Sequence, residues 1–226
     1  MLSISFDDEW RITHAGAVIG ILELSDIGNI HSSARLDERK RATEAFLRER
    51  YQGFSRQDFL ALPVMSAYDQ YYKRFNKTYH VQLQVESIVL RGKNLPNVSP
   101  LVDVNFIAEM ETFVLTAAHD VAKLQGSIAI GVSREGDHIT QMNGDHKAIR
   151  VDDMIMRDAN GICCSIIYGQ DARSPISPET SHVLYVAYAP PGVPSETVDT
   201  QLRRIQENIR LFSSTAVVEQ CQLLLA

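Results

Sequence analysis

The sequence predicts an α/β (α+β) fold in which N-terminal helices pack on a mainly antiparallel, β-rich second half. Strong helix formers, with apolar residues three or four positions apart, fill much of the chain before Gly126. After Gly126 apolar residues alternate with small or polar ones, and turn residues recur at short intervals. No stretch between the two halves has the composition of a linker, so residues 1–226 are expected to form a single domain.

The first half is expected to open with strand and to continue with helices. Residues 10–24, WRITHAGAVIGILEL, are rich in β-branched and small apolar side chains and predict one or two buried strands, closed by a turn at residues 25–29. Residues 33–51 combine strong helix formers with an apolar stripe and charges of both signs, which predicts a surface helix. Apolar residues between Val81 and Val89 predict another helix.

The second half reads as antiparallel sheet followed by one helix. Residues 128–132 alternate between apolar and small side chains, and Gly, Asn and Asp cluster at three turns. Those turns are expected at residues 135–137, 143–145 and 158–161. Residues 182–189 predict a further strand, and apolar side chains from Val198 to Phe212 predict a closing helix. The tail, residues 215–225, fits either helix or strand.

A helix start at Ser99 and Pro100 lies within the most informative stretch, residues 94–120. Ser99 can cap a helix by accepting a backbone N–H bond, and Pro100 fits the first helical position. Asp103 then lies near the positive end of the helix dipole. One face is expected to be buried and carries Val102, Phe106, Met110, Phe113 and Ala117. The loop 93–97 is expected beside this helix start, which would gather amides and a carboxylate at one edge.

A second face of the same helix carries Asn105, Glu109 and Thr112. Two interpretations fit this face. It is either simply solvated, as exposed carboxylates commonly are, or it forms a polar edge that binds a ligand. The spacing alone does not separate the two.

The segment 70–79, QYYKRFNKTY, interleaves cations with aromatic rings. Lys73, Arg74 and Lys77 could hold phosphates while the rings stack on bases or ribose, which makes these three residues candidates for nucleic-acid binding. The alternative is a helix whose aromatic side chains belong to the core and whose cations face water.

The composition argues against several classes of protein. A net charge of −6 and a pI near 5.6 disfavour a protein that grips nucleic acid by bulk electrostatics and leave room only for a local basic patch. No window approaches the roughly 20 apolar residues of a membrane span. The start MLSISFDDEW lacks the basic residues and apolar run of a secretory signal, so a cytoplasmic protein is expected.

Cysteine and histidine usage predicts neither a metal nor another cofactor. Of three cysteines, Cys163 and Cys164 are adjacent within an apolar run, which indicates buried thiols rather than disulfides or a zinc site. The seven histidines have no metal-ligand spacing. The signatures GxGxxG, GxxxxGK[ST], HExxH and GxSxG are all absent from the sequence.

Two groups of motifs in the sequence are informative about its family. The first is Leu-Pro-Asn at residues 95–97, then Leu-Val-Asp-Val-Asn-Phe at residues 101–106 and a helix expected to end at His119-Asp120. The second lies within residues 142–189, with its order of turn, Asp-Asp strand, apolar strand, glycine, acidic residue and Thr-led strand. Both groups resemble the tRNA-editing domain of the bacterial phenylalanyl-tRNA synthetase β subunit. The resemblance covers roughly residues 80–190 and suggests a free-standing version of that editing domain.

The resemblance implies an aminoacyl pocket between the helix that bears the Asp-x-Asn signature and the sheet. In that family, mischarged tyrosyl-tRNA is hydrolysed there. The family's signatures fall on the candidate substrate-binding residues Asp103, Asn105, Gly169 and Thr180. Asp171 falls about where the family has a glutamate that is important for the reaction.

The chain departs from the family pattern at three points. The family's Gly-Gly pair is Gly169-Gln170 here, and its glutamate is the shorter Asp171. The histidine of the family's His-x-x-Asp motif is displaced by two positions, to His119.

The function that the resemblance implies is trans-editing, the hydrolysis of the ester of a mischarged aminoacyl-tRNA at the tRNA 3′ end. Asp171 or His119 would orient the water as catalytic residues, and backbone N–H groups around Gly169 would face the oxyanion. Asn105 and Thr180 would bind polar parts of the aminoacyl group. Asp171 equally fits a plain turn between strands.

Two other classes of function stay open at this point. One is a tRNA- or small-ligand-binding module of the same fold without catalytic activity, and the other is a structural partner protein. The sequence specifies neither the amino acid, nor the tRNA, nor the oligomeric state.

Overall fold

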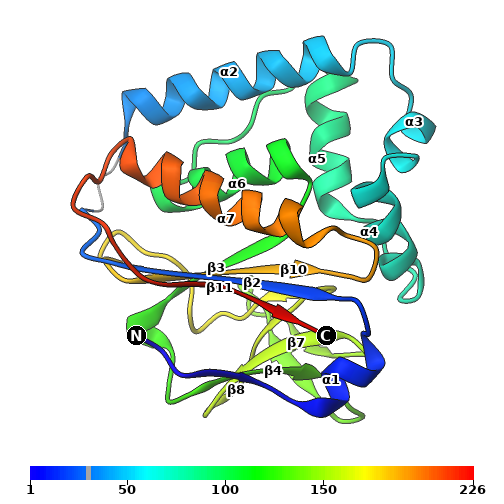
Figure 1. Ribbon diagram of the computed structural model, residues 1–226, viewed down its shortest axis with the longest axis vertical. Helices are drawn as coiled ribbons and strands as arrows, with labels where there is room; N and C mark the ends of the chain where they lie inside the picture. The colour runs from blue at the N-terminus through cyan, green and yellow to red at the C-terminus, as the bar shows by residue number, and fades with distance from the viewer. Residues whose placement is uncertain (29–31) are drawn as a thin grey trace.

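The computed structural model describes residues 1–28 and 32–226 and has three layers (Figure 1). Helices cover one face of a four-stranded sheet, and a five-stranded sheet lies on the opposite side of that sheet (Figure 1). The mixed α/β architecture predicted from the sequence is confirmed. No helix within the described ranges has the length and apolarity needed to cross a membrane.

The four-stranded sheet forms the middle layer, is antiparallel throughout and has the order β11-β2-β10-β3. Its strands are β2 (Val18–Ser25), β3 (Thr116–Asp120), β10 (Val183–Ala189) and β11 (Val217–Leu225). Every residue of β10 is buried, because helices cover one face of the sheet and the second sheet covers the other. Burial on both faces explains why β10 reads as a continuous apolar run rather than an alternating one.

The five-stranded sheet has the order β1-β4-β7-β8-β9, with β1 parallel to β4 and the other pairs antiparallel. Its strands are β1 (Ile4–Phe6), β4 (Ile128–Val132), β7 (Met154–Asp158), β8 (Gly161–Ser165) and β9 (Gly169–Gln170). A ribbon of β5 (His138–Thr140) and β6 (His146–Ala148) is joined to this region by a bridge between Gln141 and Asp171. The predicted antiparallel second half is therefore present.

Seven α-helices lie within the described residues. They are α1 (Asp8–Thr13), α2 (Ala34–Arg50), α3 (Arg56–Leu60), α4 (Pro63–Lys73), α5 (His80–Val89), α6 (Pro100–Thr112) and α7 (Ser195–Arg210). The predicted helices over residues 33–51, 81–89 and 198–212 correspond to α2, α5 and α7. The tail, left open by the sequence, is strand β11.

The N-terminal prediction needs correction. Trp10 lies in α1, where Asp7 caps the helix by accepting the Trp10 backbone N–H at 2.7 Å, so the strand begins only at Val18. The predicted turn at residues 25–29 ends at Asn29, which lies outside the described residues. Because β1, β2 and β3 all come from the first half, the chain does not divide into a helical half and a sheet half.

Helix α6 starts where the sequence predicts but ends earlier. It stops at Thr112, because Phe113 adopts the left-handed conformation with φ 62°, and residues 116–120 form β3 instead. The Ser99 side chain makes no capping bond; the Asp103 carboxylate accepts the Val98 N–H at 3.1 Å in that region. Asn105, Glu109 and Thr112 are all buried, so the solvated interpretation of their face is wrong.

Helix α7 packs directly on the middle sheet, with Gly20 of β2 beneath it. A β-carbon at Gly20 would lie 2.7 Å from Cγ1 of Val198, so only glycine allows this close approach. Helix α6 packs against both α7 and β3, and this position brings Asn105 to the edge of the cavity described next.

Candidate functional site

A cavity of about 710 Å³ lies between α6, β3 and the β8–β9 region. Most of its wall is apolar and includes Val102 and Phe106 from α6, Leu115 before β3, Ile166 after β8 and Tyr188 from β10. Its volume falls within the range of roughly 300–1,000 Å³ that is typical of small-molecule sites. The predicted location, between the Pro100 helix and the region around Gly169, therefore does contain a cavity.

The polar side chains of this wall are all uncharged types or histidine. They belong to His80, Ser99, Asn105, Thr116, Ser165, Gln170 and Ser177, and Tyr188 adds a hydroxyl to its apolar ring. Among the described lining residues there is no Lys, Arg, Asp or Glu. Burial lowers the pKa of His80, so this ring is neutral near pH 7. The cavity therefore offers a bound molecule hydrogen bonds but no formal charge.

Asn105 lies on the cavity wall with the orientation of its amide fixed by its neighbours. Its Nδ2 donates to the Thr116 carbonyl oxygen at 2.9 Å and more weakly to Glu109 Oε1 at 3.4 Å. Its Oδ1 is buried and has no partner among the described residues. Glu109 Oε1 also accepts the Thr116 N–H at 2.9 Å, and burial raises the pKa of Glu109 to about 8. Glu109 is thus mostly protonated, and therefore uncharged, at neutral pH.

Gln170 replaces the second glycine of the family's Gly-Gly pair and also lies on the cavity wall. Its Nε2 donates to the carbonyl oxygens of Ala118 at 2.7 Å and Ser174 at 2.8 Å, and lies 3.2 Å from His119 Nδ1. Because both carbonyl groups are acceptors only, the nitrogen must point toward them. The side-chain oxygen of Gln170, Oε1, receives no hydrogen bond from any described residue.

Ser165 connects the cavity wall to a buried carboxylate. Its hydroxyl donates to Asp153 Oδ2 and accepts the Tyr168 N–H at 3.0 Å. Tyr71 donates to Asp153 Oδ1 at 2.7 Å. Burial raises the pKa of Asp153 to about 7, while the hydrogen bonds from Ser165 and Tyr71 pull it downward. A carboxyl group with a pKa near the working pH is suited to accept a proton.

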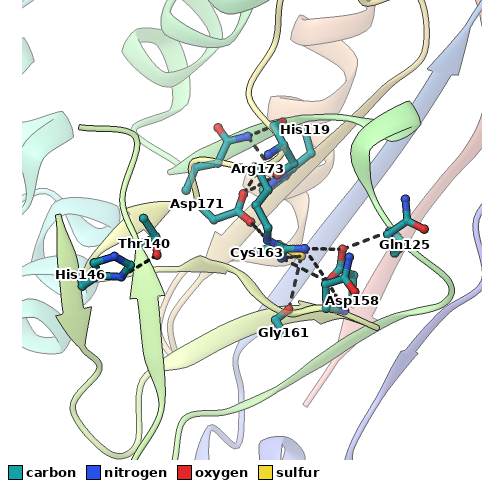
Figure 2. A network of polar contacts seen from close by, with 12 residues as sticks. His119, Gln125, Thr140, His146, Asp158, Gly161, Cys163, Asp171 and Arg173 are labelled. Atoms are coloured by element: carbon teal, nitrogen blue, oxygen red, sulfur yellow. Dashed lines mark hydrogen bonds and ion pairs between the residues drawn. The ribbon is translucent and has the colours of Figure 1, made fainter. Parts of the chain in front are cut away.

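Asp171 and His119, the predicted catalytic residues, lie in a separate buried network (Figure 2). Ser174 donates to Asp171 Oδ1 at 2.7 Å, and its oxygen lies 2.7 Å from His119 Nδ1. Arg173 lies between two carboxylates and pairs with Asp171 at 2.7 Å and with Asp158 at 3.2 Å (Figure 2). We call the following five residues the ionic network: His119, Asp158, Asp171, Arg173 and Ser174.

The ionic network does not form part of the cavity wall. Neither Asp171 nor His119 lines the cavity, so the expectation that Asp171 faces the pocket is wrong. Burial lowers the pKa of His119 to about 3, because the charged imidazolium is disfavoured there. Gln170 touches both the cavity and His119 and so links the two regions.

The predicted substrate-binding residues divide into two groups. Asn105 and Gly169 line the cavity. Thr180 does not, because its hydroxyl donates to Asp120 Oδ2 at 2.8 Å and accepts the Ser177 N–H at 2.9 Å. Asp103 is held by buried Lys40, whose Nζ lies 2.6 Å from its carboxylate.

Lys40 also explains why the loop 93–97 lies beside the start of α6, as predicted. Its Nζ donates to the Pro96 carbonyl oxygen at 2.9 Å and to Asn97 Oδ1 at 2.8 Å. The gathered amides and carboxylate therefore surround a lysine. Sequence reasoning missed Lys40 because it lies on α2, distant in the chain.

The aromatic rings of segment 70–79 are buried, so the interpretation in which those rings stack on bases is wrong. The buried rings are those of Tyr71, Tyr72, Phe75 and Tyr79. The cations remain at the surface: Lys73 pairs with Asp69 at 2.6 Å, and Lys77 lies 5.9 Å from the centre of the Tyr168 ring. Tyr168 directly precedes Gly169, which places Lys77 near the cavity.

The cavity residues that the sequence did not indicate include Gln170, Ser165 and His80. Gln170 carried a signal, since it stands where the family has glycine. Ser165 and His80 carried none, because each belongs to an apolar or ordinary helical stretch and gains its position only from the packing of distant elements.

Comparison with known proteins places the chain in a family. The model of the B3/4 domain matches residues 66–210, more than half of the chain. The chain belongs to the B3/4 domain family.

Relatives with known names are synthetase subunits. The chain is 26% identical over 133 residues to the phenylalanine-tRNA ligase beta subunit of Vibrio vulnificus, and 25% identical over 123 residues to that of Vibrio parahaemolyticus. These matches cover 56% and 53% of this chain but only 17% and 15% of the relatives, so the chain corresponds to a small part of each.

A solved structure is also similar to this chain. It is an N-terminal fragment of the phenylalanyl-tRNA synthetase beta subunit from Pyrococcus horikoshii, with a TM-score of 0.46 and 9% sequence identity. The similarity covers 96% of this chain and 54% of that fragment.

Proposed function

We propose that the chain is a trans-editing deacylase that binds the aminoacylated 3′ end of a tRNA and hydrolyses the ester of a mischarged tRNA. Membership of the B3/4 domain family supports this proposal, as does the similarity to proteins named phenylalanine-tRNA ligase beta subunits. The aminoacyl group would occupy the cavity, while the tRNA would remain outside it.

The single observation that carries the proposal is the absence of charge from the described cavity wall. A free amino acid would bring a carboxylate into this space, where neither Lys nor Arg is available to pair with it. Burying an unpaired carboxylate is costly. An aminoacyl ester carries no such charge, because its carboxyl group is bonded to the ribose oxygen. The cavity therefore fits the ester better than the free amino acid.

We assign the proton-accepting role to Ser165 and Asp153. A water molecule attacks the ester carbonyl carbon and gives its proton through the Ser165 hydroxyl to Asp153. The carbon–oxygen bond to the ribose then breaks, and the proton passes to the leaving ribose oxygen. Free amino acid and deacylated tRNA are the products. An aminoacyl ester is reactive, so positioning and modest base assistance are sufficient.

The ionic network holds one residue of the cavity wall, Gln170, in position. Asp171 holds Ser174, and Ser174 and His119 both contact Gln170 on the cavity wall. Asp171 and His119 are therefore proposed as positioning residues, in place of the catalytic role expected from the sequence.

The test is a deacylation screen over a set of correctly and incorrectly charged tRNAs, with release of labelled amino acid as the measurement. We expect release from a small subset of mischarged tRNAs and a rate that follows enzyme concentration. Binding of each charged tRNA and its uncharged form is measured in parallel.

A binding module without hydrolysis is the second candidate function. It is favoured by the observation that Asp171 and His119, the titratable residues expected to act on water, lie outside the cavity. This alternative predicts tighter binding of charged than of uncharged tRNA with no release from either. A protein that does neither would instead fit a structural partner.

A further inference from the structure

We infer that Asn105 and Gln170 together read the free amino group of the bound aminoacyl ester. The inference rests on the proposed function and adds to it a substrate class: amino-acid esters whose nitrogen is unmodified, in preference to N-acylated or deaminated esters.

Asn105 presents an acceptor and cannot present a donor. Both hydrogens of its Nδ2 already point to acceptors, the Thr116 carbonyl oxygen and Glu109 Oε1. Rotating the amide by half a turn would face its oxygen toward the Thr116 carbonyl oxygen, which repels it. The remaining Oδ1 is a buried acceptor without a partner, in a side chain that is only 6% exposed. Such an atom gains a hydrogen bond when a donor enters the cavity.

Gln170 presents an acceptor for the same reason. Its two N–H bonds are used by the carbonyl oxygens of Ala118 and Ser174, which fixes the orientation of the amide. No described residue donates to its side-chain Oε1, and the residue itself borders the cavity. Gln170 thus matches Asn105 in chemistry, although one lies on β9 and the other on α6.

Two acceptors on separate elements call for at least two donated hydrogens. The ester group has none, since both of its oxygens only accept. A single hydroxyl on an amino-acid side chain has one. The amino group has two or three, and every aminoacyl ester carries it whatever its side chain. The amino group is therefore the ligand group whose hydrogens match this pair of acceptors.

The charge state of the surroundings agrees with recognition by dipoles rather than by an ion pair. The carboxyl group next to Asn105 belongs to Glu109, which is protonated at neutral pH. No described residue of the wall bears a negative charge. Acetylation of the ligand's nitrogen would remove donors and add a group that the two carbonyl oxygens cannot bond.

The experiment measures binding of three stable probes by calorimetry. The first is 3′-deoxyadenosine linked through a 3′ amide to L-phenylalanine, the second is its N-acetyl form and the third is its 3-phenylpropanoyl form, which lacks the amino group. We expect the unmodified probe to bind about tenfold or more tightly than the other two, as the loss of two hydrogen bonds in an enclosed site implies. Equal binding of all three probes overturns the inference.

A variant distinguishes recognition from support of the wall. Gln170→Lys keeps donors for the carbonyl oxygens of Ala118 and Ser174 but removes the acceptor. We expect its preference for the unmodified probe to fall several-fold, with the melting temperature close to that of the unsubstituted protein. Gln52→Lys, at an exposed turn, is the matched control for the added charge. If Gln170→Lys keeps the full preference, Gln170 serves only the wall and the inference is overturned.

Failure of this inference and failure of the proposed function give different results. If the protein prefers the unmodified probe but releases no amino acid from any charged tRNA, the inference is supported and the deacylase activity is contradicted. If the protein deacylates tRNA but binds all three probes equally, the deacylase activity is supported and the inference is contradicted.

Discussion

Gln170 links the cavity to the ionic network, yet the carboxyl groups of the two regions have opposite surroundings. Beside the cavity, Glu109 and Asp153 form no ion pair with any residue that the structure describes, and burial raises the pKa of both, to about 8 and about 7. In the ionic network, Asp171 and Asp158 share the guanidinium of Arg173. The region with the most charge is therefore the one whose charges are already satisfied, and the uncharged region is the one left open to a ligand.

The largest expected effect comes from removing the cation of the ionic network. Arg173→Met leaves two buried carboxylates unpaired, and we expect the free energy of unfolding to fall by about 3 kcal/mol. That value lies at the low end of the range for buried pairs, because the arginine side chain is 35% exposed. Urea denaturation gives the measurement.

The matched control for this variant is Arg203→Met. Arg203 pairs with Asp199 at 2.8 Å on the surface of α7, so its loss should cost less than about 0.5 kcal/mol. Similar losses from both variants would mean that the ionic network contributes no more than a surface pair.

A second prediction separates chemistry from support. Ser165→Ala should lower the deacylation rate constant about 10²-fold with little change in tRNA affinity, because it removes the proton path to Asp153. Ser174→Ala, which loosens Asp171 and His119, should lower stability more than it lowers the rate per folded molecule. If Ser174→Ala removes as much of the rate as Ser165→Ala, the ionic network takes part in the chemistry.

The third prediction concerns pH. Folded Glu109 keeps its proton up to about pH 8, well above its ordinary value of 4.5, and folded Asp153 does so up to about pH 7. The stability that each contributes is complete below its ordinary pKa and is lost as the pH rises through its folded pKa. Burial lowers the pKa of His14 to about 4 and that of His119 to about 3, so these rings destabilise the fold as the pH falls below 6.5.

Between about pH 5 and pH 6.5 the contributions of these carboxyl groups and histidines oppose each other, and His80, whose pKa burial also lowers, adds to the histidine contribution. Glu109→Gln removes the contribution of one of the two carboxyl groups. The free energy of unfolding of this variant should rise with pH across that window by about 1 kcal/mol per pH unit relative to the unsubstituted protein. Glu207→Gln, at an exposed site on α7, is the control. Parallel curves for all three proteins would show that Glu109 is ionised in the fold.

The smallest expected effect is at the surface. Changing Lys73, Arg74 and Lys77 together to Ala should weaken tRNA binding and reduce the slope of log affinity against log salt by about 1–2, less than three contacts would give because Lys73 already pairs with Asp69. Arg203 and Arg210 on α7, changed to Ala, provide the control. An unchanged slope in the triple variant would place the tRNA elsewhere.

The sequence predicted most elements but only part of the site, for a physical reason. Periodicity and turn residues report on local backbone geometry, and they located α2, α5, the start of α6 and the strands after Gly126. They do not report which polar residues will meet across the fold. Asp103 pairs with Lys40 instead of facing the ligand cavity. Asp171 pairs with Arg173, which also pairs with Asp158, and so does not line the cavity wall.

The same limit explains the polar face of α6. Asn105, Glu109 and Thr112 have the spacing of a solvated stripe, and nothing in their spacing shows that β3 and α7 will cover it. Thr112 donates to Gln201 at 2.6 Å, and Gln201 donates to Thr116 at 2.9 Å, so the stripe becomes a buried chain of hydrogen bonds. Asn105 is left with one unmatched oxygen at the end of that chain, which marks it as a candidate ligand contact.

The order of strands in the middle sheet has a consequence for how the chain folds during synthesis. Strand β2 comes early in the chain, yet both of its neighbours, β10 and β11, come from the last quarter. Its run VIGILEL has no lasting partner until the ribosome has made those late strands. Pairings between such distant segments slow folding and leave apolar strands exposed to aggregation. Truncation before β10 should therefore give an insoluble product. The unpaired strand β2 should be the segment that chaperones bind during synthesis.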